Sequence, residues 1–546
     1  MHSLACFGAI ASTLLLLLHP AEAGKDIRPR RPPPPEDFDL EVGLDSAESH
    51  GSIKSATFQQ LIDHRNPGLG TFSQRYWYND KWYAGPGAPI VLRAPEESDG
   101  WDGFLLNTTQ SGMFGQTNRA AVIHVEHRYY GESSPFANLT VANLQHLTLD
   151  NAIQDLVYFA NNVVFPFDKK RSSSPDKAPW VLTGCSYAGA LTAWIYRLAP
   201  GTFWAYHCSS AVVEAIPDFW EYYAPVEAAM PRNCSKDVKS VVKHIDQVLS
   251  SDDVGAKYAL KKRFALQGLS HNNDFVVALE FAFASWQGTS FIPPKTQSRF
   301  FQFCDYVENV FPETKTHHVP GPEGVGLEKA LNGWARWTSE VFVPGWCGDY
   351  DYWQGDNKTV ACFDYNNDQN PFYHDLSIEN QADRQWKWLL CNEAFEWWRV
   401  QGPPGVDPGL VSKFADLAYT RMMCEKMFPW DGKYAVGLDA GRSAATVNKM
   451  TGGWDFGKTK RLMWTAGEYD PWRPATVAAD RRPGGPLPSS PEAPVWVIPK
   501  AAHCSDAYTK AVQYNADFAR IFNEILVKMK SWVDEFYVEK NVARPL

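Results

Sequence analysis

A serine between a strand-like run and a helix-like run is the clearest chemical feature of this sequence. The segment 180–196 reads Trp-Val-Leu-Thr, then Gly-Cys-Ser-Tyr-Ala-Gly, then a helical pattern, and Ser186 stands in the turn. A sharp turn of small residues lifts a serine oxygen above a sheet, and the N-terminus of the following helix stabilises negative charge that develops there. The sequence therefore predicts Ser186 as a nucleophile, with the backbone N–H of Tyr187 as an oxyanion-hole donor.

A serine hydroxyl is a weak nucleophile, so a base and a residue that orients the base must follow it. In hydrolases with this kind of turn, the order along the chain is serine, acid, histidine. Asp470 comes directly after the apolar run 461–466, and His503 comes directly after the run 495–499. Each would be an ordinary turn or surface residue if taken alone. Their order and their places after strand-like runs predict Asp470 as the orienting acid and His503 as the general base.

A second segment, residues 441–445, also matches the pattern glycine, any residue, serine, any residue, alanine. No apolar strand precedes it, and the reactive geometry requires one. We therefore expect no catalytic role for Ser443.

The elements that hold these residues form an alternating pattern at both ends of the chain. Short apolar runs predict strands of a parallel sheet covered by helices on both faces; they span 89–94, 120–126, 180–184, 206–213, 461–466 and 495–499. A helix is expected over 149–161, because its apolar residues share one face.

The middle of the chain, 216–445, has a different character, with aromatic-rich helical segments such as 383–398. With 546 residues, the chain exceeds a typical single domain. We therefore predict an α/β fold, namely an α/β-hydrolase domain formed by residues 51–215 and 446–546, into which residues 216–445 are inserted as a helical cap domain.

The first fifty residues lie apart from this fold. Residues 1–23 contain a short apolar run that ends in Ala-Glu-Ala, which is typical of a secretory signal peptide. The run is shorter than the roughly 20 apolar residues that a membrane anchor needs. Residues 24–50 begin rich in proline and arginine and are interpreted as a linker or propeptide. We expect a secreted protein with no membrane partner, or alternatively a vacuolar or lysosomal one.

Cysteines and glycosylation sequons fit this route. Ten cysteines are present, and Cys6 lies in the predicted signal peptide, so nine remain and at least one must stay unpaired. The cysteines from 234 to 424 are expected to tie the cap together. Asparagine sequons, candidate glycosylation sites, occur at Asn107, Asn138, Asn233 and Asn357.

The charge of the chain excludes one class of partner. Its formal net charge is -10 and its pI is about 5.8, and no basic run lies within the folded part. Phosphate backbones require a basic face, so no nucleic-acid partner is expected. No cofactor or metal is expected either.

Several motifs together resemble the S28 serine peptidases, from about Phe58 to the C-terminus. The markers are Phe58–His64, Thr71–Tyr76, Glu126–Ser133, the turn at Ser186, Asp470-Pro-Trp472 and His503. Within that family the sequence is most similar to fungal prolyl endoproteases, through Gly201–His207, Gly321–Ala330 and Thr451–Asp455. Two segments depart from the usual pattern: Cys185 and Ala188 stand in the turn, and Glu96 stands where relatives carry a small residue.

The resemblance implies a serine peptidase that cleaves peptides and proteins on the carboxyl side of proline at acidic pH, through an acyl-enzyme. Trp472, two residues after the proposed acid, is expected to receive the proline ring, because a flat apolar wall suits a ring without an N–H. Glu97 and Tyr130 are further candidate substrate-binding residues. The segment Glu126–Tyr130 begins at a strand end and is expected to shape the site, although a buried ion pair of Glu126 with Arg128 is an equally good interpretation of its charged residues.

Two other functions stay open at this point. A lipase or esterase could use the same three residues, and a binding protein could retain the fold without activity. The sequence also leaves open whether a peptidase of this kind acts as an endopeptidase, a dipeptidyl peptidase or a carboxypeptidase.

Overall fold

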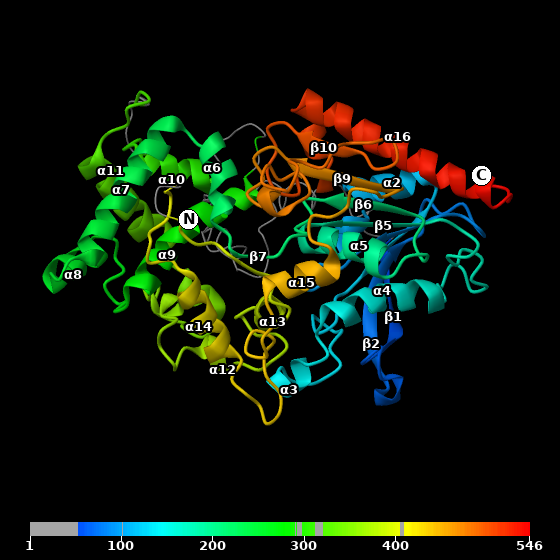
Figure 1. Cartoon of the computed structure of the whole chain (residues 1–546), viewed down its shortest axis with the longest axis horizontal. Helices are drawn as coiled ribbons and strands as arrows, with labels where there is room; N and C mark the ends of the chain where they lie inside the picture. Colours follow the sequence, from blue (N-terminus) through cyan, green and yellow to red (C-terminus); the bar gives the residue numbers. More distant parts are fainter. Residues whose placement is uncertain are drawn as a thin grey trace, which may run out of the picture.

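The computed structural model describes residues 53–100, 102–289, 291, 298–311, 320–403 and 409–545. The predicted signal peptide and the predicted linker or propeptide, residues 24–50, lie outside these residues. The described chain forms two lobes, one built around a β-sheet and one of helices, which lie at the right and left of Figure 1. The described helices include none with the length and apolar character that a bilayer span requires.

The sheet lobe is organised around eight strands in the order β1-β2-β4-β3-β5-β6-β9-β10. The strands are β1 (Ile53–Leu61), β2 (Thr71–Asn79), β3 (Ile90–Arg93), β4 (Ala121–Val125), β5 (Trp180–Cys185), β6 (Ala205–Ser209), β9 (Leu462–Gly467) and β10 (Val495–Ile498). From β4 to β10 neighbouring strands run parallel, whereas β2 is antiparallel to both β1 and β4. The six predicted strands are confirmed, and the fold is of the α/β-hydrolase class. The antiparallel pair β1 and β2 was not predicted.

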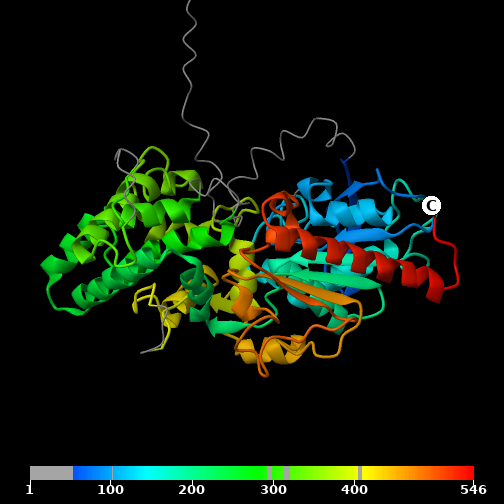
Figure 2. The same cartoon turned by 90° about the horizontal axis from the view of Figure 1, so that it is seen from above.

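Helices cover both faces of this sheet, as Figure 2 shows. Helices α2 (Gln110–Asn118) and α16 (Ala516–Glu539) pack on one face, and α4 (Leu149–Asn162) and α5 (Ser186–Leu198) pack on the other, with α15 (Ala444–Thr451) against α5; the short α3 (Val141–Leu144) precedes α4. Alternate strand residues face opposite layers: Val91 packs in the cluster that includes α16, whereas Ile90 and Leu92 pack in the cluster that includes α4 and α5. The strands therefore bury both faces, which explains why they are apolar without alternation.

Helix α4 confirms the helix expected near residue 149. Thr148 caps its N-terminus, accepting a hydrogen bond from the backbone of Asn151, and Leu149, Ile153 and Leu156 are buried along one face.

The second lobe, the helical insert, lies between β6 and β9 in the sequence. Its helices are α6 (Tyr223–Ala229), α7 (Arg232–Ser250), α8 (Val254–Arg263), α9 (Asn272–Ala284), α10 (Arg299–Val307), α11 (Leu327–Trp337), α12 (Pro371–His374), α13 (Arg384–Asn392) and α14 (Leu417–Met427). A short parallel pair, β7 (Ile216–Asp218) and β8 (Glu396–Trp398), joins the start of the insert to its later part. The prediction that 383–398 is helical throughout is thus wrong at its end, because Glu396–Trp398 pairs with β7.

Three disulfides cross-link the insert, as the cysteine pattern predicted. They join Cys234 to Cys304, Cys347 to Cys362 and Cys391 to Cys424. A fourth joins Cys185 to Cys504 in the sheet lobe, and Cys208 is a free, buried thiol. Eight of the nine cysteines outside the predicted signal peptide are therefore paired, and the unpaired one, Cys208, lies in the central strand β6.

Candidate active site

The turn between β5 and α5 has the geometry that a nucleophilic serine needs. Ser186 is the first residue of α5 and has φ 59°, a left-handed conformation that is uncommon for a residue with a side chain. The turn requires small neighbours: a Cβ on Gly184 would lie 2.3 Å from the carbonyl oxygen of Ala188, and one on Gly189 would lie 2.6 Å from that of Ser209. Ser186 is partly exposed, although both its neighbours are buried.

Asp470 and His503 meet at the ends of β9 and β10. The Nδ1 atom of His503 lies 2.8 Å from Oδ1 of Asp470, and because a carboxylate only accepts, Nδ1 donates. Both residues are buried. The other ring nitrogen, Nε2, is also buried and has no hydrogen-bond partner among the described residues. In the neutral ring, Nε2 therefore carries no proton and can accept one.

A disulfide brings this pair to the serine. Cys185 precedes Ser186 and Cys504 follows His503, and the Cα atoms of the two cysteines lie 5.9 Å apart. The residues predicted as nucleophile and base therefore belong to one site. The Ser186 hydroxyl is not hydrogen-bonded to Nε2 in this structure, and such contacts often form only when substrate binds.

Tyr187, the predicted oxyanion residue, is held rigidly by a histidine. The Nδ1 atom of His127 lies 2.9 Å from the carbonyl oxygen of Arg128, so Nδ1 donates, and Nε2 accepts from the Tyr187 hydroxyl at 3.1 Å. Burial lowers the pKa of His127 to about 4, which keeps the ring neutral and this arrangement intact. On the other side, Trp386 of α13 packs edge-on against Tyr187, with ring centroids 5.4 Å apart.

Trp472 lies between the two lobes in an aromatic environment. Its ring centroid is 5.6 Å from that of Phe219, 5.3 Å from Tyr222 and 6.1 Å from His503. Its Nε1 donates to Gln287 at 2.8 Å, in a 3-10 turn that follows α9. The indole is therefore beside the base, as the sequence predicted, and it also contacts the insert.

Glu97 and Tyr130 are close to each other and to Tyr187. Burial, together with the negative charges of Glu96 and Asp383, raises the pKa of Glu97 to about 8. Burial and the charges of Asp383 and Glu97 hold the pKa of Tyr130 well above its ordinary value. Glu97 is thus a carboxyl that stays protonated at acidic and neutral pH, near the proposed oxyanion residue.

The predicted ion pair of Glu126 with Arg128 is wrong. Glu126 pairs with Arg75 at 2.6 Å, and Arg128 binds both carboxylate oxygens of Asp155, at 2.7 and 2.5 Å. Arg75 lies in β2 and Asp155 lies in α4. No sequence pattern indicates that Arg75 pairs with Glu126 or that Asp155 pairs with Arg128. These two ion pairs connect the segment after β4 to β2 and to α4.

The remaining predicted positions lie away from this site. Ser443 is exposed and caps the N-terminus of α15. Asn107, Asn138 and Asn357 are exposed, as a glycan acceptor must be. Asn233 is only 7% exposed, and its side-chain nitrogen donates to the carbonyl of Pro320. The sequon at Asn233 is therefore inaccessible in the folded protein, which corrects that prediction.

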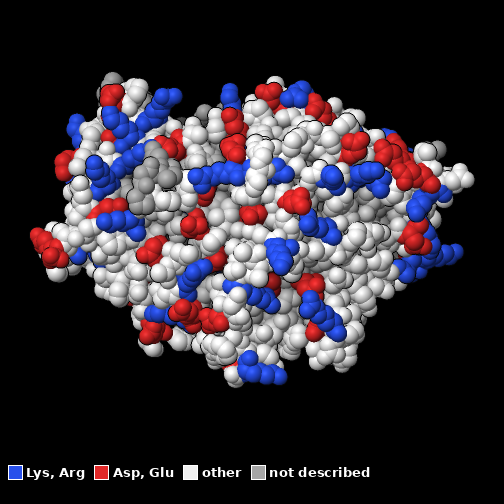
Figure 3. Space-filling view, viewed as in Figure 1, with Lys and Arg blue, Asp and Glu red and all other residues white. Residues whose placement is uncertain are grey.

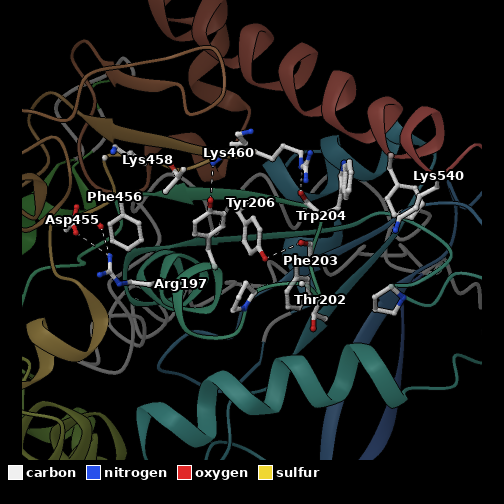
Figure 4. A pocket seen from close by; sticks show the side chains of 18 residues that line it. Arg197, Thr202, Phe203, Trp204, Tyr206, Asp455, Phe456, Lys458, Lys460 and Lys540 are labelled. Carbon is white, nitrogen blue, oxygen red and sulfur yellow. Dashed lines mark hydrogen bonds and ion pairs between the residues drawn. The ribbon is translucent and has the colours of Figure 1, made fainter.

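A pocket that no sequence pattern indicated lies at the opposite edge of the sheet (Figure 4). It has a volume of about 960 Å³ and is lined near the starts of β6 and β9, whereas the candidate site follows strand ends. Its basic residues are Arg197, Lys458, Lys460, Arg461 and Lys540. Because it lies near the strand starts, the pocket is separate from Ser186. On the face of the molecule shown in Figure 3, acidic and basic side chains are interspersed.

Comparison with known proteins assigns the chain to a family. The family model for serine carboxypeptidase S28 matches residues 60–288 and 348–520. The chain belongs to the S28 serine peptidases. It is 38% identical to the serine protease vicPa of Bipolaris victoriae over 89% of each chain. It is 28% identical to a probable extracellular serine carboxypeptidase of Arthroderma benhamiae, over 79% of this chain and 59% of that one. Among solved structures, an esterase, LipW of Mycobacterium marinum, aligns with TM-score 0.33 and 11% identity over 92% of this chain and 89% of that one.

This S28 peptidase is accordingly a hydrolase whose substrates are peptides or proteins. The helical insert and the mixed sheet seen in the described residues match the predicted class, an α/β-hydrolase domain with a helical insert.

Proposed function

We propose that this S28 peptidase is a secreted enzyme that hydrolyses peptide bonds on the carboxyl side of proline at acidic pH, with Ser186, His503 and Asp470 as its catalytic residues. The observation that carries the proposal is the hydrogen-bonded pair of His503 and Asp470, joined to the Ser186 turn through a disulfide. Serine, base and acid also follow the chain order of this fold.

In the proposed mechanism, Nε2 of His503 accepts the proton of the Ser186 hydroxyl as the oxygen attacks the substrate carbonyl. Asp470 receives the hydrogen bond from Nδ1, so it fixes the tautomer and stabilises the imidazolium that forms. The backbone N–H of Tyr187 stabilises the oxyanion. His503 then protonates the leaving amine, and a water molecule hydrolyses the acyl-enzyme by the same route.

Specificity for proline is proposed to come from the aromatic walls beside the base. Trp472 packs with Phe219 and Tyr222 and stands at 6.1 Å from the His503 ring, so an apolar substrate ring held there would be next to the reacting carbonyl. Proline fits such a pocket by contact alone, since its nitrogen offers no N–H that would need a partner.

Glu97 is proposed to bind substrate as a neutral carboxylic acid. Because its pKa is raised to about 8, the protonated form, which can donate a hydrogen bond, prevails at the proposed working pH. Tyr130 would offer a second hydroxyl close by; its oxygen is buried and has no hydrogen-bond partner among the described residues.

Buried titratable groups support an acidic working range. Burial raises the pKa values of Glu97, Glu308 and Glu214 from 4.5 to about 8, 7 and 6, so the stability that these groups contribute is full below pH 4.5 and is lost as pH rises. Burial lowers the pKa values of His124 and His127 from 6.5 to about 3 and 4, so their contribution is lost as pH falls below 6.5. The raised carboxyl pKa values therefore favour the folded protein at acidic pH, and the two histidines oppose this effect as the pH falls.

Secretion is supported by the apolar N-terminal run and by the name of the Arthroderma relative, which is called extracellular. The exposed sequons at Asn107, Asn138 and Asn357 are compatible with that route. A vacuolar or lysosomal location is the alternative, and immunodetection of the protein in culture medium decides between them.

A digest tests the proposed activity directly. A proline-containing protein is incubated with the purified enzyme between pH 4 and 7, and the products are identified by mass spectrometry. New C-termini at proline support the proposal, and their positions distinguish internal cleavage from release of dipeptides or of C-terminal residues. Cleavage without preference for proline would contradict the specificity. Hydrolysis of p-nitrophenyl esters alone would indicate an esterase, and failure of a fluorophosphonate to label Ser186 would indicate a disabled enzyme.

A further inference from the structure

The Cys185–Cys504 disulfide occupies an unusual position. It connects the last residue of β5 to the loop after β10, across a sequence separation of 319 residues. In the sheet, β6 and β9 lie between these two strands. The hydrogen bonds of the sheet fix neighbouring strands, but they do not by themselves set the distance between loops that leave strands three positions apart. The disulfide does so directly, next to Ser186 and His503.

Both ends of this link carry strained backbone. Ser186, next to Cys185, has φ 59°, and Cys504 itself has φ 53°. Left-handed conformations of residues with side chains are costly, and they persist only where the surroundings hold them. A covalent link between the two segments is such a constraint.

The histidine loop is also anchored by hydrogen bonds at Cys504 and two residues beyond it. The backbone N–H of Cys504 donates to Oγ of Ser210 at 3.1 Å. Two residues on, Asp506 is buried and accepts from the hydroxyls of Ser209 and Thr465, the latter at 2.5 Å. The Ser209 oxygen also lies 3.4 Å from Sγ of Cys185. The loop is therefore fixed to β6 and β9, and the disulfide adds the connection to β5.

The disulfide lies against the base as well. The two sulfur atoms and a ring nitrogen of His503 are all within 4.8 Å of one another. Cys185 is buried, whereas Cys504 is partly exposed. The disulfide is therefore a close neighbour of the imidazole.

We propose that the Cys185–Cys504 disulfide is a positioning element of the reaction, which holds the Ser186 turn and the His503 loop at the separation that proton transfer requires. The inference rests on the proposed function, since it takes Ser186 and His503 as the reacting pair. Misplacement of reacting groups by about 1 Å can cost about a hundredfold in rate, so loss of the link should act mainly on kcat.

The test compares two double variants. Cys185→Ala with Cys504→Ala removes this link, and Cys347→Ala with Cys362→Ala removes a disulfide of the insert as a matched control. We expect kcat to fall about tenfold to a hundredfold in the first variant, with KM changed less than about threefold, and its acid limb in the pH profile of kcat to shift. The control variant should keep kcat within about twofold. All assays contain EDTA, so that no adventitious metal binds near His503.

Reduction of the folded wild-type enzyme covers the case in which the double variant does not fold. The purified enzyme is treated with a phosphine, which reduces the disulfide to two thiols; these are alkylated, and the opened disulfides are identified by mass spectrometry. Loss of kcat that parallels alkylation of Cys504 supports the proposal, and so does recovery when an unalkylated sample is reoxidised.

Two results would overturn the proposed positioning role of the disulfide while leaving the proposed peptidase function intact. A folded double variant, or a wild type alkylated at Cys185 and Cys504, that keeps the wild-type kcat and pH profile would show that the link only stabilises the fold. Failure of the proposed function is seen separately, in wild-type enzyme that a fluorophosphonate does not label at Ser186.

Discussion

Ser186 and Ser443 stand in the same short pattern of glycine, serine and alanine, yet the structure gives them opposite surroundings. Ser186 follows the buried strand β5, has φ 59°, and begins a helix whose cap makes no side-chain hydrogen bond. Ser443 follows a surface turn and has an extended backbone with φ -150°, and its hydroxyl accepts from the backbone of Thr446 in a capping box. The helix uses the Ser443 hydroxyl, whereas the Ser186 hydroxyl remains available for chemistry. The short pattern thus indicates a nucleophile only where a buried strand precedes it.

The largest effect expected is loss of activity in Ser186→Ala. Removing the nucleophile should lower kcat by about 10⁴-fold or more, leaving the residual rate that oxyanion stabilisation and binding supply. Peptide hydrolysis by the folded variant is the measurement. Ser443→Ala is the matched control and should keep kcat near wild type; activity lost at Ser443 instead of Ser186 would reverse the comparison.

Asp470→Asn tests whether catalysis at Ser186 depends on a correctly oriented base. An amide in place of the carboxylate no longer fixes the His503 tautomer, so kcat should fall by about 10⁴-fold with little change in structure. Kinetics and circular dichroism are measured together. A variant within about tenfold of wild type would remove Asp470 from the proposed triad.

Trp472→Ala tests whether the indole forms a wall of the proposed proline pocket beside Ser186. Loss of an apolar pocket wall should lower kcat/KM for proline substrates by about 1 to 3 kcal/mol, which is about fivefold to 150-fold. The measurement compares peptides with proline and with alanine before the scissile bond. If the variant loses thermal stability but keeps its preference for proline, Trp472 only packs the insert onto the sheet lobe.

Glu97→Gln tests the raised carboxyl pKa near the site. The pKa of Glu97 is raised to about 8, so the wild type loses stability between pH 4.5 and 8 as the unfolded chain releases a proton that the folded chain retains. Glutamine removes this loss, and the variant should gain stability over the wild type toward pH 8, by on the order of a few kcal/mol. Thermal unfolding at pH 4.5 and pH 8 measures the gain. The exposed Glu492→Gln serves as control, and an equal gain there would refute the assignment.

Ser443→Ala should have the smallest effect, and on stability alone. Loss of the cap on α15 is expected to cost about 1 kcal/mol, visible as a lower Tm with unchanged kinetics. A stability unchanged from wild type would show that the capping box contributes nothing measurable.

Local sequence determined much of the fold. The six central strands and α4 were predicted, because apolar runs of strand length and a helical apolar face are properties of short segments. That at least one of the nine cysteines outside the predicted signal peptide stays unpaired followed from their odd number, and Cys208 is that residue. The order Ser186, Asp470, His503 was also readable from the sequence, and the hydrogen bond between the last two agrees with it.

Tertiary structure alone decided the rest. The partners of Cys185, Glu126 and Arg128, and the burial of Asn233, depend on residues far away in the sequence or from other elements. No local pattern encodes which of nine cysteines meet. The disulfide beside Ser186 and His503 exists because parallel strands place their carboxyl ends at one edge of the sheet, and that edge forms only when residues 319 positions apart pack together.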